Sequence, residues 1–170
     1  MEQTYRDQRL NMIHEGTNGI QSLDLLGRKM KTGLSVLLKR VRQDIVAAKK
    51  IDDSELSMRA NALEMALERL QSTCTVLLGK MTDSQKLALA NSHEFLNMTG
   101  HIIIGWMWLR QETAACLALE DCDEERKNFL RGKRLTSEYF FGHELPKTIA
   151  QAELLVSLND TVLRMDNGFY

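Results

Sequence analysis

A heptad repeat of apolar residues constrains the fold of this chain more than any other feature. The repeat fills two positions of every heptad, with Leu56, Leu63, Leu70 and Leu77 in the first and Ala60, Leu67, Cys74 and Met81 in the second. Such a spacing forms one stripe along a helix, and the stripe must be buried against partner helices. The partner is either a second copy, in a dimerising zipper, or other helices of the same chain. The intramolecular bundle is favoured because amphipathic segments flank the repeat on both sides.

Those flanking segments predict the remaining helices. Residues 20–31 form a first helical face, Gly33 interrupts it, and a second face runs to about residue 50. A long helix is expected over residues 84–119, and a last one follows the acidic turn at 120–125 until Gly142 and Pro146 break it. In the last helix the apolar face is assigned to Phe129, Leu135, Tyr139 and Phe140, with Ile149, Ala152, Leu155 and Val156 after the break.

The predicted fold class is therefore all-α, an up-and-down bundle of about four long helices preceded by a short helix-turn-helix motif segment. A single proline and abundant Leu, Ala, Met, Lys, Glu and Arg favour helix over sheet. Residues 102–108 are apolar all round the helix and are expected to be its most buried turn. Gly100 and Gly105 lie inside the same helix and predict close packing of a neighbour. The predicted shared core consists of Leu63, Leu67, Leu70, Ile102 and Trp106.

Charge and cysteine content exclude several function classes. With 22 basic and 23 acidic residues, the net charge of −1 provides no strong field for nucleic acid or an anionic membrane. No apolar run reaches the roughly 18 residues of a membrane span. Cys74, Cys116 and Cys122 lie in helical patterns, so reduced thiols and a cytoplasmic location are expected. The four histidines and these cysteines lack the spacing of a metal site, and no metal is predicted.

A short motif near the beginning of the chain is the candidate site. It reads Glu15-Gly16-Thr17-Asn18-Gly19 and precedes a helical face that starts at Ile20. Thr17 or Asn18 can cap that helix, whose free N–H groups favour anions. Glu15 is then either a carboxylate that acts on a bound ligand or a solvated charge at a helix–turn–helix joint.

The sequence around this motif resembles the acyl-CoA dehydrogenase family. Arg6-Asp7, Leu10, Met12-Ile13, Glu15-Gly16-Thr17 and Ile20-Gln21 match a signature near the C-terminus of that family in order and spacing. His14 departs from it, because the family most often has tyrosine there. A weaker resemblance, carried by residues 108–110 and 133–140, is to the helical C-terminal extension of one subgroup, the methylthiopropionyl-CoA dehydrogenase type.

The resemblance implies a flavin-dependent oxidoreductase of fatty acid metabolism, which converts an acyl-CoA to the 2-enoyl-CoA with FAD. It assigns Glu15 as the catalytic base, His14 and Gly16 to the substrate, and Thr17, Asn18 and Gly19 to the cofactor. It also implies an electron acceptor of the electron-transfer flavoprotein type and a homo-oligomer.

The resemblance divides the chain into residues 1–31, the end of the dehydrogenase helical domain, and residues 32–170, the extension. The domains that precede this signature in the family have no counterpart in these 170 residues. The expectation is therefore a C-terminal fragment that is inactive and binds no FAD by itself. The alternative is a stand-alone helical interaction or dimerisation module without catalysis.

Overall fold

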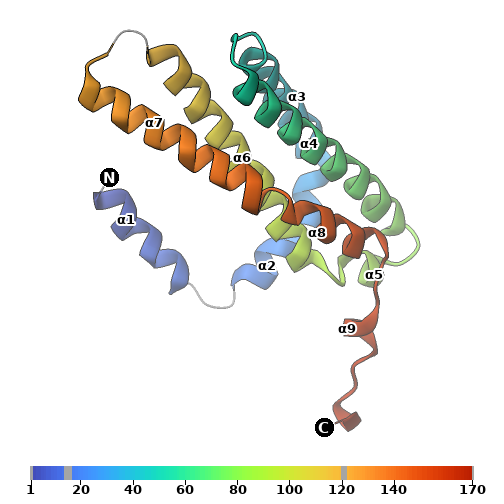
Figure 1. Ribbon diagram of the computed structural model, residues 1–170. Helices are drawn as coiled ribbons and strands as arrows, with labels where there is room; N and C mark the ends of the chain where they lie inside the picture. Colours follow the sequence, from blue (N-terminus) through green and yellow to red (C-terminus); the bar gives the residue numbers. More distant parts are fainter. Residues whose placement is uncertain (1, 14–16, 120–121, 170) are drawn as a thin grey trace.

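The computed structural model describes residues 2–13, 17–119 and 122–169, which contain helices and no strand (Figure 1). The predicted all-α fold is confirmed. The elements follow in the order α1 (Glu2–Gln8), η1 (Arg9–Met12), α2 (Thr17–Asp24), η2 (Leu25–Lys29), α3 (Met30–Ala48), α4 (Ser54–Lys80), α5 (Gln85–Leu89), α6 (Ser92–Ala118), α7 (Glu124–Tyr139), η3 (Phe140–Glu144), α8 (Lys147–Val156), α9 (Thr161–Arg164) and η4 (Asn167–Phe169). Of the η elements, η2 and η3 are π-helical turns and the other two are 3₁₀ turns.

The long helices form the predicted bundle. α4 packs against α3, α6 and α8, and α6 also packs against α7 (Figure 1). The heptad stripe of α4 is buried along its length, since Leu56, Leu63, Leu70 and Leu77 are at most 2% exposed. The stripe is therefore covered by helices of its own chain, as predicted, and Asp53 caps α4 by accepting a hydrogen bond from the Leu56 N–H at 2.8 Å.

Four of the five predicted core residues are fully buried, and the exception is Trp106. Its ring lies at the edge of the core, where Nε1 donates to Asp44 Oδ2 at 2.7 Å. An indole needs an acceptor for its N–H, and this requirement keeps Trp106 near the surface. The expectation that residues 102–108 are the most buried turn was wrong: Ile104 is 48% exposed, because no helix of the described chain covers that side of α6.

Two predicted helix boundaries were also wrong. Gly33 lies within α3, and the departure from α-helical geometry comes earlier, at the π-turn η2. A single glycine costs a helix only about 1 kcal/mol, which the buried face of α3 offsets. The long helix expected from residue 84 is divided into α5 and α6, because Asn91 departs from helical geometry. Asn91 Nδ2 instead donates to the carbonyl oxygen of Asn159, at 2.7 Å.

The two glycines of α6 differ in their surroundings. A Cβ atom on Gly105 would lie 3.3 Å from Leu145 Cδ1 and 3.4 Å from Phe140 Cε1, so this glycine permits the close packing that was predicted. A Cβ atom on Gly100 would meet nothing within 4 Å, so the same expectation was wrong there.

The buried face of α7 is not the predicted apolar one. Phe129, Leu135 and Tyr139 are exposed, whereas Leu130 and Ser137 are buried. Of the four residues predicted on this face before the break, only Phe140, in η3, faces the core. The reason is that the side of α7 toward the bundle meets buried charges on α4 and α6 and is itself polar. The predicted break near Gly142 and Pro146 is confirmed, since the π-turn η3 ends before Pro146 and α8 follows it. After the break, Ala152 and Leu155 are buried as predicted, whereas Ile149 and Val156 are exposed.

Candidate functional site

The predicted site begins at the turn before α2. His14, Glu15 and Gly16 lie outside the described residues. Thr17, Asn18 and Gly19 form the first turn of α2, so neither Thr17 nor Asn18 is the residue that precedes the helix. The structure therefore groups the three predicted cofactor residues at one helix N-terminus.

The first turn of α2 is attached to the bundle through Ser22. This side chain is 1% exposed, its Oγ donates to the carbonyl oxygen of Gly19 at 2.8 Å, and it lies 3.1 Å from Ser92 Oγ at the start of α6. Leu26, one turn further along, is fully buried in the core. The position of Gly19 is thus fixed by a side chain that lies within the fold.

The opposite side of this region is open. Asn18 and Gly19 are exposed, and a Cβ atom on Gly19 would have no heavy atom within 4 Å. Ahead of it, residues 2–13 form an N-terminal arm in which no described side chain is buried. The arm lies to one side of the bundle in Figure 1, and its large apolar residues Tyr5, Leu10 and Ile13 are exposed, as is Ile20 of α2. These four large apolar side chains are accessible to a partner.

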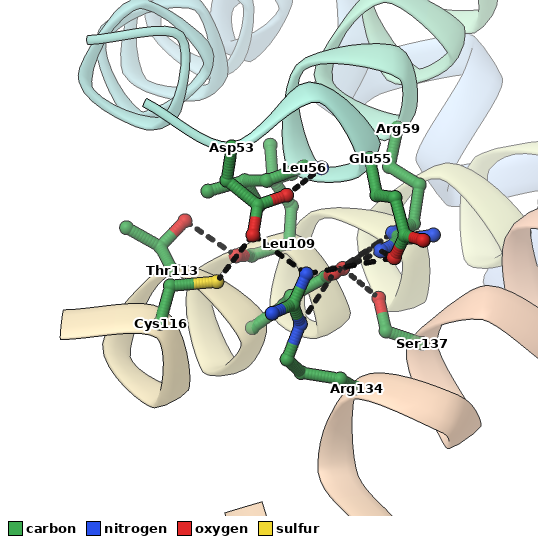
Figure 2. A network of polar contacts seen from close by, with 10 residues as sticks. Asp53, Glu55, Leu56, Arg59, Leu109, Thr113, Cys116, Arg134 and Ser137 are labelled. Carbon is green, nitrogen blue, oxygen red and sulfur yellow. Dashed lines mark hydrogen bonds and ion pairs between the residues drawn. The ribbon is translucent and has the colours of Figure 1, made fainter. Parts of the chain in front are cut away.

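A second cluster of chemically active groups lies inside the bundle, between α4, α6 and α7 (Figure 2). Glu112 of α6 is fully buried, and both of its carboxylate oxygens lie 2.8 Å from Arg59 Nε. Arg59 Nη2 also donates to Glu112 Oε1, and Ser137 Oγ donates to Glu112 Oε2 at 2.7 Å. These charge-assisted bonds satisfy the carboxylate that burial would otherwise destabilise.

Arg134 of α7 connects this pair to the beginning of α4. Its Nη2 donates to Asp53 Oδ2 at 2.7 Å, and its Nε lies 3.7 Å from Glu112 Oε1. Burial alone would raise the pKa of Asp53, but the hydrogen bond from Leu56 N–H and the charges of Arg134 and Arg59 outweigh it and lower that pKa. Arg59 likewise has a raised pKa, because its bonds to Glu112 outweigh the opposing effect of burial.

This network stabilises the fold rather than forming a reaction centre. Every oxygen of Glu112 is bonded, and the carboxylate has no contact with solvent. Sequence reasoning missed it, because only apolar residues were used to find the buried face of α7. The available signal was the spacing of Leu130, Arg134, Ser137 and Phe141, which follows helical periodicity and includes two polar residues.

Cysteines, metal ligands and membrane spans add no other centre among the described residues. Cys74 is buried, and burial raises the pKa of its thiol to about 12; burial also raises the pKa of the Cys116 thiol. Within the described ranges, no three His, Cys, Asp or Glu side chains are grouped as metal ligands would be. None of the helices in the described part of the chain has the length and apolar character to cross a membrane.

Comparison with known proteins identifies the family. The family model described as "Acetyl-CoA dehydrogenase C-terminal like" matches residues 37–166, which is more than half of the chain. The chain belongs to this family. The match lies almost entirely on the bundle, from α3 to beyond α9, and confirms the acyl-CoA dehydrogenase resemblance first seen in the motif.

Two curated relatives are similar over nearly the whole chain. The broad-specificity linear acyl-CoA dehydrogenase FadE5 of Mycobacterium tuberculosis is 27% identical over an alignment of 180 residues, gaps included. The alignment covers 100% of this chain and 29% of the relative. The 3-methylmercaptopropionyl-CoA dehydrogenase of Ruegeria pomeroyi is 29% identical over 168 residues, which cover 95% of this chain and 28% of the relative. The chain thus spans less than a third of the length of the curated relatives that it matches.

Proposed function

We propose that this chain is the C-terminal part of an FAD-dependent acyl-CoA dehydrogenase that oxidises an acyl-CoA thioester to the 2-enoyl-CoA. The observation that carries the proposal is the family match, together with two relatives that are named acyl-CoA dehydrogenases and are similar over almost the whole chain. We divide the chain at residues 31 and 32, into the end of the dehydrogenase domain and a helical extension. The match to residues 37–166 falls within the extension.

The exposure of the N-terminal arm supports the proposal that this chain is part of a larger catalytic unit. Tyr5 and Ile13 are each 70% exposed although they belong to the motif region. In the proposed enzyme the preceding domains cover these apolar side chains, and the arm lies between those domains and the bundle. The alternative function, a stand-alone module that dimerises through the heptad stripe, is disfavoured because that stripe is already buried within the chain.

The residues at the beginning of α2 are of types that can contact a cofactor such as FAD. Thr17 provides a hydroxyl, Asn18 an exposed amide, and Gly19 a backbone with open space where a Cβ atom would be. Bound FAD would supply the acceptor for the hydride that leaves the β-carbon of the substrate. Glu15 removes the α-proton, Gly16 leaves room for the thioester and His14 borders the acyl chain.

The isolated chain is proposed to be colourless and inactive, since it lacks most of the contacts that a ligand as large as FAD requires. The electron-transfer flavoprotein-type acceptor and homo-oligomeric state belong to the proposed complete enzyme. The cytoplasmic location stays a prediction.

The decisive experiment replaces Glu15 in the full-length enzyme and follows flavin reduction by anaerobic stopped-flow. Glu15→Gln keeps the size of the side chain and removes the base. Flavin and acyl-CoA should still bind, while reduction slows by at least about a hundredfold. Glu2→Gln, the same substitution on the exposed arm, is the matched control and should reduce at the normal rate. If Glu15→Gln also does so, the base lies elsewhere and Glu15 is a charge at a helix end.

A further inference from the structure

A groove between α4 and α8 belongs neither to the motif region nor to the buried charge network. Its two neighbouring hollows share Arg69 of α4 and Ile149 of α8 in their linings, and together they are called the α4–α8 groove. Along α4 it extends from Ala62 to Thr73. At 1.5 Å per residue, this is a length of about 16 Å.

One end of the groove is apolar. Met65 and Ile149 are 60% and 46% exposed, and Ala62, Phe141 and Pro146 complete this end. Ile149 and Val156 belong to the face of α8 that the sequence predicts to be buried, yet both remain exposed here. The apolar face of α8 is therefore wider than the surface that α4 and α6 cover.

The other end of the groove is the more polar one, because Arg69, Thr73 and Glu153 lie there beside apolar residues of α8, and it has unused bonding capacity. Thr73 is fully buried, lines the groove, and its Oγ1 has no hydrogen-bond partner. Arg69 makes no ion pair with any described residue, and its Nη1 lies 3.4 Å from Thr148 Oγ1, a long hydrogen bond. Leaving a buried hydroxyl unpaired is costly, so a partner outside the described chain would stabilise this end.

We propose that the α4–α8 groove binds a straight-chain carboxylate, with the alkyl chain at the apolar end and the carboxylate on Arg69 and Thr73. The polarity changes along one direction, as it does along such a ligand. A guanidinium without an ion-pair partner and an unused hydroxyl provide the donors that a carboxylate accepts. The site consists only of bundle residues, so it is independent of Glu15 and of the proposed dehydrogenase chemistry.

Glu153 makes the proposal sharper. It lines the polar end and is exposed, so its negative charge opposes a bound carboxylate across solvent. Removing that charge should tighten carboxylate binding, whereas removing the charge of Arg69 should weaken it. Substitutions of Arg69 and Glu153 are thus expected to change the affinity for an anionic ligand in opposite directions. Neither should change the affinity for a neutral ligand.

The test is calorimetric titration of the 170-residue protein with dodecanoate below its micelle concentration, in parallel with dodecanol and butanoate. Dodecanoate is expected to bind with one site, and butanoate, which lacks the chain, not measurably. Arg69→Gln should weaken dodecanoate by about tenfold or more and Thr73→Val by about threefold to tenfold. Glu153→Gln should tighten it, and none of the three should change dodecanol binding.

Several results would overturn the proposal. These are the absence of dodecanoate binding, an affinity equal to that of dodecanol, or an Arg69→Gln variant that is folded by circular dichroism and binds normally. Self-association of the protein that Met65→Glu abolishes, without carboxylate binding, would identify the groove as an interface between copies. Because Glu153 is exposed, Glu153→Gln should fold even if Arg69→Gln does not, and an unchanged affinity in Glu153→Gln would count against the site.

Discussion

The N-terminal arm and the bundle contain the same kinds of side chain in opposite environments. Leu70 of α4 is fully buried, whereas Leu10 of the arm is 54% exposed. Arg59 forms a buried pair with Glu112, whereas Arg6 pairs with Glu2 on the surface of α1. The same residue types therefore stabilise the bundle, where they are buried, but contribute little in the arm, where they are exposed. Helices of this length depend on packing rather than on intrinsic propensity.

The largest expected effect comes from breaking the buried ion pair. Arg59→Met should lower the free energy of unfolding by about 3–5 kcal/mol, because Glu112 remains buried without its main partner. Arg6→Met is the matched change in the arm and should leave the unfolding midpoint unchanged, since that pair is exposed. Chemical denaturation of both variants measures the contrast. A double variant, Arg59→Met with Glu112→Met, should recover most of the loss, and its failure to do so would show that the pair is not the cause.

A slightly smaller effect is expected from matched leucines. Leu70→Ala should cost about 2–5 kcal/mol, because it removes apolar contacts and leaves a cavity in the core. Leu10→Ala should cost less than about 0.5 kcal/mol in this chain, as substitutions at exposed sites do. Thermal unfolding distinguishes the two. In the full-length protein Leu10→Ala should become more costly if preceding domains cover the arm, and an equal, small cost there would contradict that role.

The smallest effect tests how closely the bundle itself is packed. Gly100→Ala should stabilise the protein by about 0.5–1 kcal/mol, because alanine loses less backbone entropy in a helix and the added methyl meets no neighbour. Gly105→Ala should not give this gain, since its methyl would press on Leu145 and Phe140. Equal changes in the two denaturation midpoints would show that Leu145 and Phe140 adjust freely.

The comparison also explains which parts of the fold could be predicted. The stripe from Leu56 to Leu77 repeats regularly, and burial of a helix stripe needs no knowledge of its partner. Trp106 and Gly100 were harder, because their environments depend on which neighbouring helix approaches and on which side. α7 was misjudged for a related reason: Arg134 and Ser137 face inward only because Glu112 and Asp53 are there to meet them.

The candidate site stays a prediction. The spacing from Arg6 to Gln21 identified the family, and the structure places Thr17, Asn18 and Gly19 together at the start of α2. His14, Glu15 and Gly16 lie outside the described residues, so their proposed roles depend on the motif and the family alone. The α4–α8 groove could not be predicted, because its polar end combines residues of two helices that are far apart in the sequence.

The sequence by itself determined the helical class, the buried stripe of α4 and the family, because each depends on spacings along one segment. Only the tertiary structure decided the partners of Glu112, the open face of the arm and the unused donors of Arg69 and Thr73. These depend on distances between helices, and periodicity within one helix carries no information about what its polar side chains meet. A buried charge or an unpaired hydroxyl is a property of the packed bundle, so it becomes visible only when the helices are placed side by side.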